Sequence, residues 1–569
     1  MKPFIFKIGG EAGFGIISAG LNVSKLAARS GYFAFDYSEY PSIIRGGHNL
    51  MQIVISDEPV RAQYKTADFL VALNKETIDL HIDELGEGAG LLCDEENKPT
   101  EQGAKINIFL IPINKIAKEI GGSLLLRNTA ALGASIALLG GNLKIFKDII
   151  AQEFSAKDPK ITENNFAVCQ AAYDYAKQNY GNKIKSILKP RKTETQIVVN
   201  GNEAIALGAV AAGMKFSAIY PMTPTSGVLH ALADLQQKYD FVCKQPEDEI
   251  AAINMAIGAS FAGARSMVAT SGGGFCLMSE AYGLAGMTEM PLVIVEGMRG
   301  SPATGLPTWT EQGDLRMVLH AHQGDFPRIV LAAGDIEEAF HLTMQAFNLA
   351  DKYQTPVLVI VDKQICEGHM SLAPFNYKDY KIETGKLLLK KQDNYKRFAL
   401  SADGISTRSP AGFGNYVMAN SDEHDETGYS NEGAQNRIAQ MNKRMQKLQT
   451  CANEDMPAPR LIGPKNADLT IVSWGSNKGA ILEAIKNFSN VNFLHITWVS
   501  PFPAKEVKNI LNKARRILNI ECNYSAQMSG LIKERTGIKI ENNLLKYDGR
   551  PFYPEEITAQ IKKVLSSKK

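Results

Sequence analysis

The chain has 569 residues, of which 45% are hydrophobic and 21% charged, as in a soluble globular protein. Its 62 Lys and Arg residues nearly balance its 60 Asp and Glu residues, and this balance excludes the charge field that binding to nucleic acid or to an anionic membrane requires. At about 150 residues per domain, we expect three or four domains.

The sequence has no apolar run of about 18 residues, the length that a membrane-spanning helix needs. It begins with a strand-like segment and a glycine turn instead of a signal peptide, so we expect a cytoplasmic protein. Its seven cysteines include no CxxC pair, so we do not expect this chain alone to bind zinc or an iron–sulfur cluster.

The first predicted region covers residues 1–181. A short apolar strand, residues 4–8, leads into a turn that contains Gly10, Gly13 and Gly15, and an amphipathic helix follows over 16–30. Strand, glycine turn and helix open a doubly wound α/β domain, in which the helix N-terminus suits a phosphate. The glycine pattern alone is weak evidence for a ligand, because such turns also serve only to pack a helix tightly on a strand.

A basic stretch, residues 182–196, is predicted to be a linker, and it precedes a second α/β region over 197–375. An irregular connecting segment is expected over 376–463, ending in a charged helix, and a third α/β unit over 464–569. The strands predicted in the last two α/β regions are 216–220, 267–270, 292–296, 328–332, 357–361, 469–474, 493–499 and 516–521. Helices predicted between them favour parallel sheets.

Two motifs of the second region have residues suited to chemistry. In the turn Tyr220-Pro221-Met-Thr223-Pro, two prolines fix the backbone on either side of a hydroxyl at a helix start. Such a turn suits a carboxylate or phosphate ligand, although a capped helix start would look the same. Glu249 begins a helix that is otherwise apolar and small, so its carboxyl would lie at the edge of a dry interior and need a partner or a raised pKa.

Two further motifs follow two of the predicted strands. Residues 269–275 form a strand that ends in three glycines, among them Gly273 and Gly274, where a flat ligand could approach the backbone closely. Arg299 comes just past the strand 292–296. At the carboxyl end of a parallel strand its side chain would face the ligand crevice, and its planar fork matches a carboxylate.

In this order, Tyr-Pro-Met-Thr-Pro, the acidic helix start, Gly-Gly-Gly-Phe, Met-Arg-Gly-Ser-Pro-Ala-Thr-Gly-Leu-Pro-Thr and Thr-Glu-Gln-Gly-Asp-Leu resemble the α subunit of 2-oxoacid:ferredoxin oxidoreductases. The front of the chain resembles the family's γ subunit through Gly-Gly-Glu-Ala-Gly-Phe-Gly and Tyr-Pro-Ser-Ile-Ile-Arg-Gly-Gly-His-Asn. The resemblance implies a fused γ–α chain of three α/β domains with mainly parallel sheets. These are a Rossmann-like γ domain, a thiamin-diphosphate-binding pyrimidine-type domain and a transketolase C-terminal-like domain.

The resemblance also implies the reaction, a coenzyme A-dependent oxidative decarboxylation of a 2-oxoacid, such as 2-oxoglutarate or pyruvate, to acyl-CoA and CO₂ with electrons passed to ferredoxin. Glu249 would contact the thiamin aminopyrimidine ring, with Glu247 as the competing candidate, and Thr223 and Arg299 would hold the substrate carboxylate. The implied cofactor-binding residues are Tyr220, Pro221, Glu249, Gly273 and Gly274. The implied coenzyme A region comprises Gly10, Gly13, Gly15, Arg45, Gly46, Gly47, His48 and Asn49.

The sequence lacks two features that this chemistry requires, a Gly-Asp-Gly type loop for the diphosphate with its Mg²⁺ and a set of cysteines for a redox centre. The resemblance assigns both, including a [4Fe-4S] cluster, to a β subunit, in a heterodimer or a dimer of heterodimers, and no metal to this chain. Trp309 departs from the family pattern and leaves the preferred oxoacid open. The alternatives are another thiamin enzyme of transketolase-like type and a non-catalytic adaptor that binds a nucleotide or an acyl carrier at the glycine turn.

Overall fold

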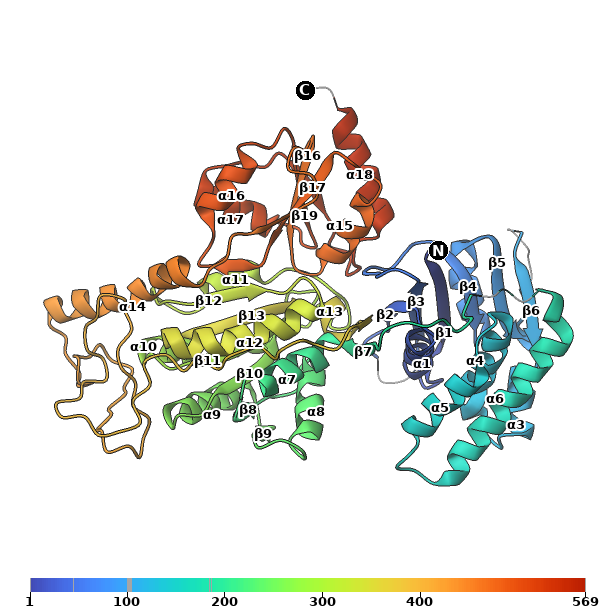
Figure 1. The fold of residues 1–569 in the computed structure, drawn as a ribbon, viewed down its shortest axis with the longest axis horizontal. Helices are drawn as coiled ribbons and strands as arrows, with labels where there is room; N and C mark the ends of the chain where they lie inside the picture. Colours follow the sequence, from blue (N-terminus) through green and yellow to red (C-terminus); the bar gives the residue numbers. More distant parts are fainter. Residues whose placement is uncertain (1, 44–45, 100–104, 184, 186, 568–569) are drawn as a thin grey trace. The chain divides into compact units, whose positions relative to one another are not determined.

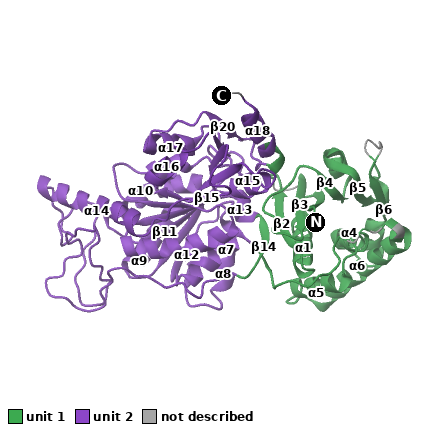
Figure 2. Ribbon diagram, turned by 45° about the horizontal axis from the view of Figure 1, so that its top comes forward, with its two compact units in different colours: residues 1–199, 368–374, 553–556 green, residues 200–367, 375–552, 557–569 purple. Residues whose placement is uncertain are grey.

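The computed structural model describes residues 2–43, 46–99, 105–183, 185 and 187–567. The chain forms two compact units (Figure 2). Unit 1 comprises residues 1–199, 368–374 and 553–556, and unit 2 comprises residues 200–367, 375–552 and 557–569. In the described part of the chain, no helix has the length and apolar character that crossing a membrane requires.

Unit 1 is built on an eight-stranded sheet with the order β6-β5-β4-β1-β3-β2-β14-β7 (Figure 1). Strands β1, β4, β5 and β6 run parallel, whereas β3 is antiparallel to both β1 and β2, and β14 is antiparallel to β2. The strands are β1 (Phe4–Glu11), β2 (Phe33–Glu39), β3 (His48–Ser56), β4 (Ala67–Ala72), β5 (Leu85–Asp94), β6 (Asn107–Ile111), β7 (Ile197–Asn200) and β14 (His369–Leu372).

The helices of unit 1 are α1 (Ile16–Arg29), α2 (Lys75–His81), α3 (Ile113–Glu119), α4 (Arg127–Leu138), α5 (Leu143–Glu153) and α6 (Pro159–Tyr180). Helices α1, α4, α5 and α6 share one hydrophobic core with the sheet, in which Phe6 and Ile53 are fully buried. Helices α4 and α6 approach closely because Gly133 lies against the backbone of Cys169, where a methyl group would collide. The residues that alternate with these along the strands, such as Ile5 and Val54, form a second hydrophobic cluster, so both faces of the sheet are buried, as in a doubly wound fold.

Unit 2 contains two sheets. The seven-stranded sheet has the order β18-β12-β13-β11-β10-β8-β9 and the five-stranded sheet the order β15-β17-β16-β19-β20. All described pairs in them are parallel except β12 with β18 and β15 with β17. The strands are β8 (Phe216–Ala218), β9 (Val242–Lys244), β10 (Ser266–Ser271), β11 (Leu292–Met298), β12 (Ile329–Ala332), β13 (Pro356–Asp362), β15 (Arg460–Ile462), β16 (Leu469–Trp474), β17 (Val491–Ile496), β18 (Trp498–Ser500), β19 (Ile517–Glu521) and β20 (Asn542–Leu545).

Helices cover these sheets, with α9 against β8 and β10 and α12 against β13 (Figure 1). One hydrophobic cluster runs from Ile294 and Leu358 to Trp474 and Leu494, so the two sheets of unit 2 share a continuous core. The helices are α7 (Gly201–Ala211), α8 (Ser226–Leu235), α9 (Glu249–Phe261), α10 (Gly272–Met287), α11 (Leu315–His320), α12 (Ile336–Tyr353), α13 (Lys363–Glu367), α14 (Ala434–Glu454), α15 (Asn477–Ile485), α16 (Ala504–Leu511), α17 (Gln527–Thr536) and α18 (Pro554–Ser566).

The predicted fold class, α/β with mainly parallel sheets, is confirmed. Some details differ from the expectation, among them the predicted strand 493–499, which is two strands, β17 and β18, in different sheets. The sheet of unit 1 is mixed, because β3 inserts between β1 and β2 and pairs antiparallel with both. Residues 272–274 form the first turn of α10 instead of a separate glycine turn. Glycine suits that place because the side chains of Asp314, Thr270 and Glu249 fill the space where Cβ atoms would lie.

A buried charge cluster fixes the long excursion between β14 and β15 to the rest of unit 2. The Glu289 carboxylate is fully buried and lies 2.6 Å from the ammonium groups of both Lys443 and Lys447 on α14. Arg397 donates to the Glu289 carbonyl oxygen at 2.8 Å. Burial raises the pKa of Glu289, but the surrounding cations lower it more, so the carboxyl stays ionised. The cluster is a buried ion network in which the loss of one partner would leave uncompensated charge.

Candidate functional site

Glu249 lies at the start of α9 with its carboxyl turned inward. Asp248 precedes the helix and accepts a hydrogen bond from Ala251 N at 2.8 Å, so Asp248 serves as the N-cap. Glu249 is only 3% exposed, and among the described residues its Oε1 has no hydrogen-bond partner. Glu247, the competing candidate, is exposed. Of the two candidates, only Glu249 therefore occupies the dry position that acid–base work at this helix start would need.

The glycines that open α10 make room for this carboxyl. A Cβ atom at Gly274 would lie 2.6 Å from Glu249 Oε1, a distance that real Cβ contacts do not reach. A Cβ atom at Gly273 would meet nothing within 4 Å, so the helix start is open at that position. The structure thus brings Glu249, Gly273 and Gly274 together at the N-termini of two neighbouring helices.

Arg299 and Thr223, predicted as substrate residues, are in direct contact. The Arg299 guanidinium donates through Nη1 to the Thr223 carbonyl oxygen at 2.8 Å. The Thr223–Pro224 peptide bond, to which this carbonyl belongs, is cis. Among the described residues, no carboxylate lies within 4 Å of this guanidinium, which is only partly buried. Tyr220 and Pro221, immediately before, are also partly exposed. The arrangement leaves a fixed cation that an incoming carboxylate could pair with.

Two buried carboxyl groups lie near the Arg299 guanidinium and were not predicted as site residues from the sequence. Glu296, on β11, is fully buried, and Asp314, before α11, is 8% exposed. Burial and then the charge of Asp314 raise the pKa of Glu296 well above the usual range, which favours its protonated form. Burial also raises the pKa of Asp314, and the Arg299 charge opposes that rise. A glutamate inside the apolar strand Leu292–Met298 was the available signal.

The predicted coenzyme A region of unit 1 is assembled around the glycine turn. Gly13 and Gly15 have φ values of 97° and 71°, in the left-handed region that favours glycine. Gly47 accepts a hydrogen bond from Ala12 N at 3.0 Å and thereby ties the segment before β3 to the turn. The turn and this segment therefore form one local assembly in unit 1.

The register of β1 and β3 places the remaining residues of this region. Strand pairing sets Gly10 opposite Asn49 and Glu11 opposite His48, and Gly46 has a φ of 74°. Arg45, also predicted for this region, lies outside the described residues.

The start of α4 joins this turn, and sequence reasoning missed it. The Arg127 guanidinium carbon lies 3.9 Å from the centre of the Phe14 ring. Asn128 Nδ2 donates to the Gly15 carbonyl oxygen at 3.5 Å, and a Cβ atom at Gly15 would lie 2.5 Å from that nitrogen. No carboxylate lies within 4 Å of Arg127 among the described residues. The Arg127 guanidinium therefore lies beside the turn that precedes α1, an arrangement whose charge suits an anion.

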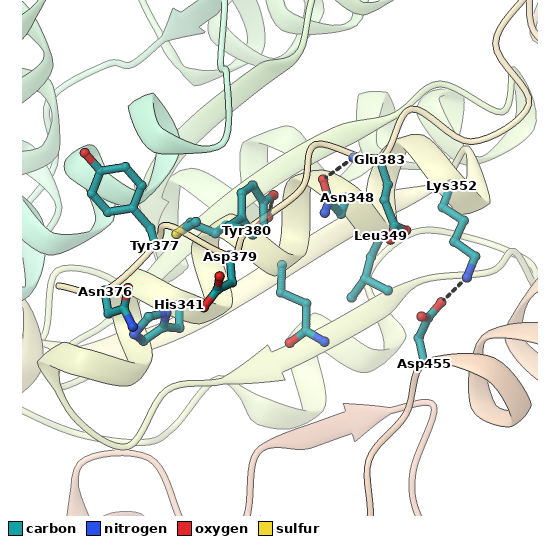
Figure 3. Close-up of a pocket in the computed structure, with 12 residues that line it drawn as sticks. His341, Asn348, Leu349, Lys352, Asn376, Tyr377, Asp379, Tyr380, Glu383 and Asp455 are labelled. Atoms are coloured by element: carbon teal, nitrogen blue, oxygen red, sulfur yellow. Dashed lines mark hydrogen bonds and ion pairs between the residues drawn. The ribbon is translucent and has the colours of Figure 1, made fainter.

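A cavity of about 380 Å³ beside α1 and α4 has Asn128 in its lining, whereas another cavity lies apart from the site residues. A cavity of about 450 Å³ beside α12 is shown in Figure 3 and contains none of the predicted site residues. Its lining includes Asp379, Glu383 and Asp455 against the single lysine Lys352, which pairs with Asp455 at 2.8 Å (Figure 3). An acidic lining of this kind disfavours an oxoacid or a phosphate.

The helices around Glu249 instead present an open apolar surface. On α9, Ile250 is 50% exposed and Met255 is 41% exposed, and on α10 Leu277 is 52% exposed. Large apolar side chains exposed together on neighbouring elements are typical of an interaction surface. The two helices that carry Glu249 and Gly274 therefore also carry exposed apolar side chains, although the Glu249 carboxyl itself is buried.

Comparison with known proteins identifies the family. The family described as "Pyruvate flavodoxin/ferredoxin oxidoreductase, thiamine diP-bdg" matches residues 207–443, and "Pyruvate ferredoxin/flavodoxin oxidoreductase" matches residues 5–175. A 2-oxoacid:ferredoxin oxidoreductase subunit alpha from Sulfolobus sp is 35% identical over 98% of this chain and 96% of its own length. A 2-oxoglutarate synthase subunit KorA from Methanothermobacter thermautotrophicus is 32% identical over 64% of this chain and 98% of its own length.

A solved structure agrees along the whole chain. It is described as 2-oxoglutarate:ferredoxin oxidoreductase from Magnetococcus marinus with 2-oxoglutarate, coenzyme A and succinyl-CoA bound. The match has a TM-score of 0.92 at 31% identity and covers 100% of both chains. These findings confirm the oxidoreductase hypothesis over the transketolase-like and adaptor alternatives. The chain belongs to the 2-oxoacid:ferredoxin oxidoreductase family, among its alpha subunits.

Proposed function

We propose that this chain is the fused γ–α subunit of an enzyme that converts a 2-oxoacid and coenzyme A to acyl-CoA and CO₂ and passes the electrons to ferredoxin. The observation that carries the proposal is the buried Glu249 carboxyl, with an unpartnered Oε1 among the described residues, beside an open helix start at Gly273. We take 2-oxoglutarate as the first substrate to test, because the Magnetococcus marinus protein is described with it bound. Pyruvate is the second.

The residues at this site fit thiamin diphosphate. Glu249 Oε1 is a buried polar atom without a partner among the described residues, and in its protonated form it could donate a hydrogen bond to a ring nitrogen; Gly274 leaves the space that the carboxyl occupies. Thiamin diphosphate, when bound, supplies a nucleophilic carbon for the 2-oxo group. Glu249 would hold a proton at Oε1 toward the pyrimidine ring, and burial excludes the water that would compete for it. Tyr220, Pro221 and Gly273 would line the ring.

Arg299 would bind the substrate carboxylate and orient the 2-oxo group. Its Nη1 bond to the Thr223 carbonyl oxygen fixes the guanidinium, so little rotational freedom is lost when a carboxylate pairs with the remaining N–H groups. The Thr223 hydroxyl would add a second, weaker contact from the same turn.

The coenzyme A region would lie at the glycine turn of unit 1. We assign Gly10, Gly13, Gly15, Gly46, Gly47, His48 and Asn49 to it and add Arg127 and Asn128. The backbone at Gly15 and the guanidinium of Arg127, which has no carboxylate within 4 Å among the described residues, supply the positive potential that a phosphate needs. In domain terms, residues 1–181 would be the γ-type domain, 197–375 the pyrimidine-type domain and 464–569 the transketolase C-terminal-like domain.

A β subunit with the diphosphate-bound Mg²⁺ and the [4Fe-4S] cluster would complete the site in a cytoplasmic heterodimer or dimer of heterodimers. The apolar surface of α9 and α10 beside Glu249 supports this partner, since it adjoins the site itself. The scattered cysteines of this chain support it too, because no two of them form a CxxC pair.

The test is to purify the chain alone and together with its β subunit and to assay a panel of 2-oxoacids with coenzyme A and ferredoxin. We expect the isolated chain to be colourless and inactive, and the complex to show iron–sulfur absorbance and oxoacid-dependent ferredoxin reduction. Iron–sulfur absorbance from the isolated chain would contradict the proposed division of cofactors. A complex that reduces ferredoxin with no oxoacid of the panel would contradict the proposed activity.

A further inference from the structure

Four ionisable side chains of unit 1 form a continuous chain of hydrogen bonds and ion pairs. His48 Nε2 lies 2.8 Å from His81 Nε2, and His81 Nδ1 lies 3.0 Å from Glu84 Oε2. Lys7 Nζ lies 2.6 Å from the same glutamate oxygen. Lys7 is 2% exposed and His81 is 9% exposed, so the inner end of the chain is buried. None of these contacts is explained by the strand pairing of the sheet.

The hydrogen-bond partners in this set of four side chains fix where the protons lie. Burial raises the pKa of Glu84, but its bond to His81 and the Lys7 charge lower it more, so Glu84 is ionised and accepts from His81 Nδ1–H. A single proton then lies between the two Nε2 atoms, since each of them can only donate to the other or accept from it. When this proton is on His48, His48 Nδ1 carries a bare lone pair. That atom is buried and has no hydrogen-bond partner among the described residues.

His48, at the outer end of the hydrogen-bonded set, adjoins the glycine turn. His48 begins β3 opposite Glu11, and the preceding Gly47 accepts the hydrogen bond from Ala12 N. A Cβ atom at Gly9 would lie 3.0 Å from His48 Cε1, so glycine at that position keeps the ring close to β1. The unpartnered acceptor of the chain is therefore part of the same assembly as Gly10 to Gly15.

We propose that His48, His81 and Glu84 form a proton relay that removes the proton from the thiol of coenzyme A. The inference rests on the proposed binding of that thiol co-substrate to unit 1. The S–H bond breaks with the electron pair left on sulfur, and the proton goes to His48 Nδ1. The proton on His48 Nε2 passes to His81 Nε2, and the positive charge ends on His81, beside the Glu84 carboxylate. The thiolate is the nucleophile that acyl transfer to coenzyme A requires.

The electrostatics of the cluster favour a relay over a single base. Burial, and then the neighbouring His81, lower the pKa of His48 to about 4, so His48 holds a second proton poorly and passes it on. Within this set Lys7 neutralises Glu84. Nearby titratable groups include Glu11, opposite His48 in the strand register, and Tyr553, whose pKa is raised by burial and then by Glu39 and Glu84. The carboxylate thus stabilises charge on His81 more than on His48.

The test uses the complex of this chain with its β subunit and the variants His48→Gln and His81→Asn. His230→Gln, an exposed histidine on α8, is the matched control. At neutral pH we expect kcat/KM for coenzyme A to fall about 10²–10⁴-fold in His48→Gln and less in His81→Asn, with no change in the control. Above the pKa of an ordinary thiol, about 8.5, the variants should approach the wild-type rate, because the thiol then ionises without a base.

A second measurement does not depend on turnover. The ultraviolet absorbance of the thiolate reports the ionisation of bound coenzyme A, and its midpoint should be about one pH unit or more lower in wild type than in His48→Gln. Binding of desulfo-coenzyme A should be equal in both. An unchanged kcat/KM, a loss that is equal at all pH values, or equal midpoints would overturn the relay. Wild-type complex that binds coenzyme A but forms no acyl-CoA would instead overturn the proposed function.

Discussion

Replacing Arg299 tests how the oxoacid carboxylate is held. In Arg299→Ala, the carboxylate loses a charged partner in a partly buried crevice, an effect of about 2–5 kcal/mol. The Thr223 carbonyl oxygen also loses the Nη1 donor at 2.8 Å, which adds about 1 kcal/mol of local destabilisation. Because the site is only partly buried, we take the middle of the range and expect kcat/KM to fall by about two orders of magnitude or more for every 2-oxoacid.

The assay is kcat/KM for several 2-oxoacids in the complex with the β subunit, beside a titration of thiamin diphosphate affinity. Arg299→Lys keeps the charge but loses the planar fork, so it should fall between wild type and Arg299→Ala. Thr223→Ala should lower kcat/KM less than Arg299→Ala does, because it removes only a hydroxyl. Arg515→Ala, at a surface pair with Asp468, is the control and should change nothing. A collapse of cofactor affinity in Arg299→Ala, with the oxoacids changing rank instead of declining together, would show that Arg299 does not hold the substrate carboxylate.

Three further predictions follow from packing and charge. Gly274→Ala should displace the Glu249 carboxyl and lower kcat, whereas Gly181→Ala, at an exposed position with open space at its Cβ, should retain kcat; equal kcat values would contradict the crowding. Glu289→Gln should lower the free energy of unfolding by about 3–5 kcal/mol in urea titrations, against less than about 1 kcal/mol for the exposed Glu454→Gln, which pairs with Lys352 at the surface, and equal losses would refute the buried network. Burial lowers the pKa of Lys447 to about 7 in the folded chain, so above that pH the unfolded chain binds more protons than the folded chain does. The free energy of unfolding should therefore rise from about pH 7 to 10, and the Lys447→Met variant should lose this pH dependence.

Much of the architecture could be predicted from local pattern. The strand Leu469–Trp474 was predicted with its bounds, because a short run of mainly apolar and β-branched residues that ends before Gly475 favours a buried strand over a helix. The strand membership of His369–Leu372 could not be predicted. It joins the sheet of unit 1 through Met370 opposite Phe35, and a pairing of residues more than 300 positions apart leaves no trace in local periodicity.

The residues of the candidate site likewise include some that could be predicted from the sequence and some that could not. The burial of Glu249 followed from the apolar, small-residue sequence after it, and the place of Arg299 after β11 followed from the predicted strand end. The direct contact of Arg299 with the Thr223 carbonyl oxygen was not predicted. Asp314 and Arg127 were missed, because what brings them to their sites is tertiary packing against Gly272 and Phe14. No periodicity in the sequence encodes such contacts.

The most direct test of the account is the rate of 2-oxoglutarate- and coenzyme A-dependent ferredoxin reduction by the complex carrying Glu249→Gln. Glutamine keeps the shape of the side chain but cannot hold the acid proton, so the account predicts a loss of about 10²–10⁴-fold with normal folding. Glu247→Gln, an exposed neighbour two residues away, should keep the wild-type rate. A Glu249→Gln complex that reduces ferredoxin at the wild-type rate would contradict the account.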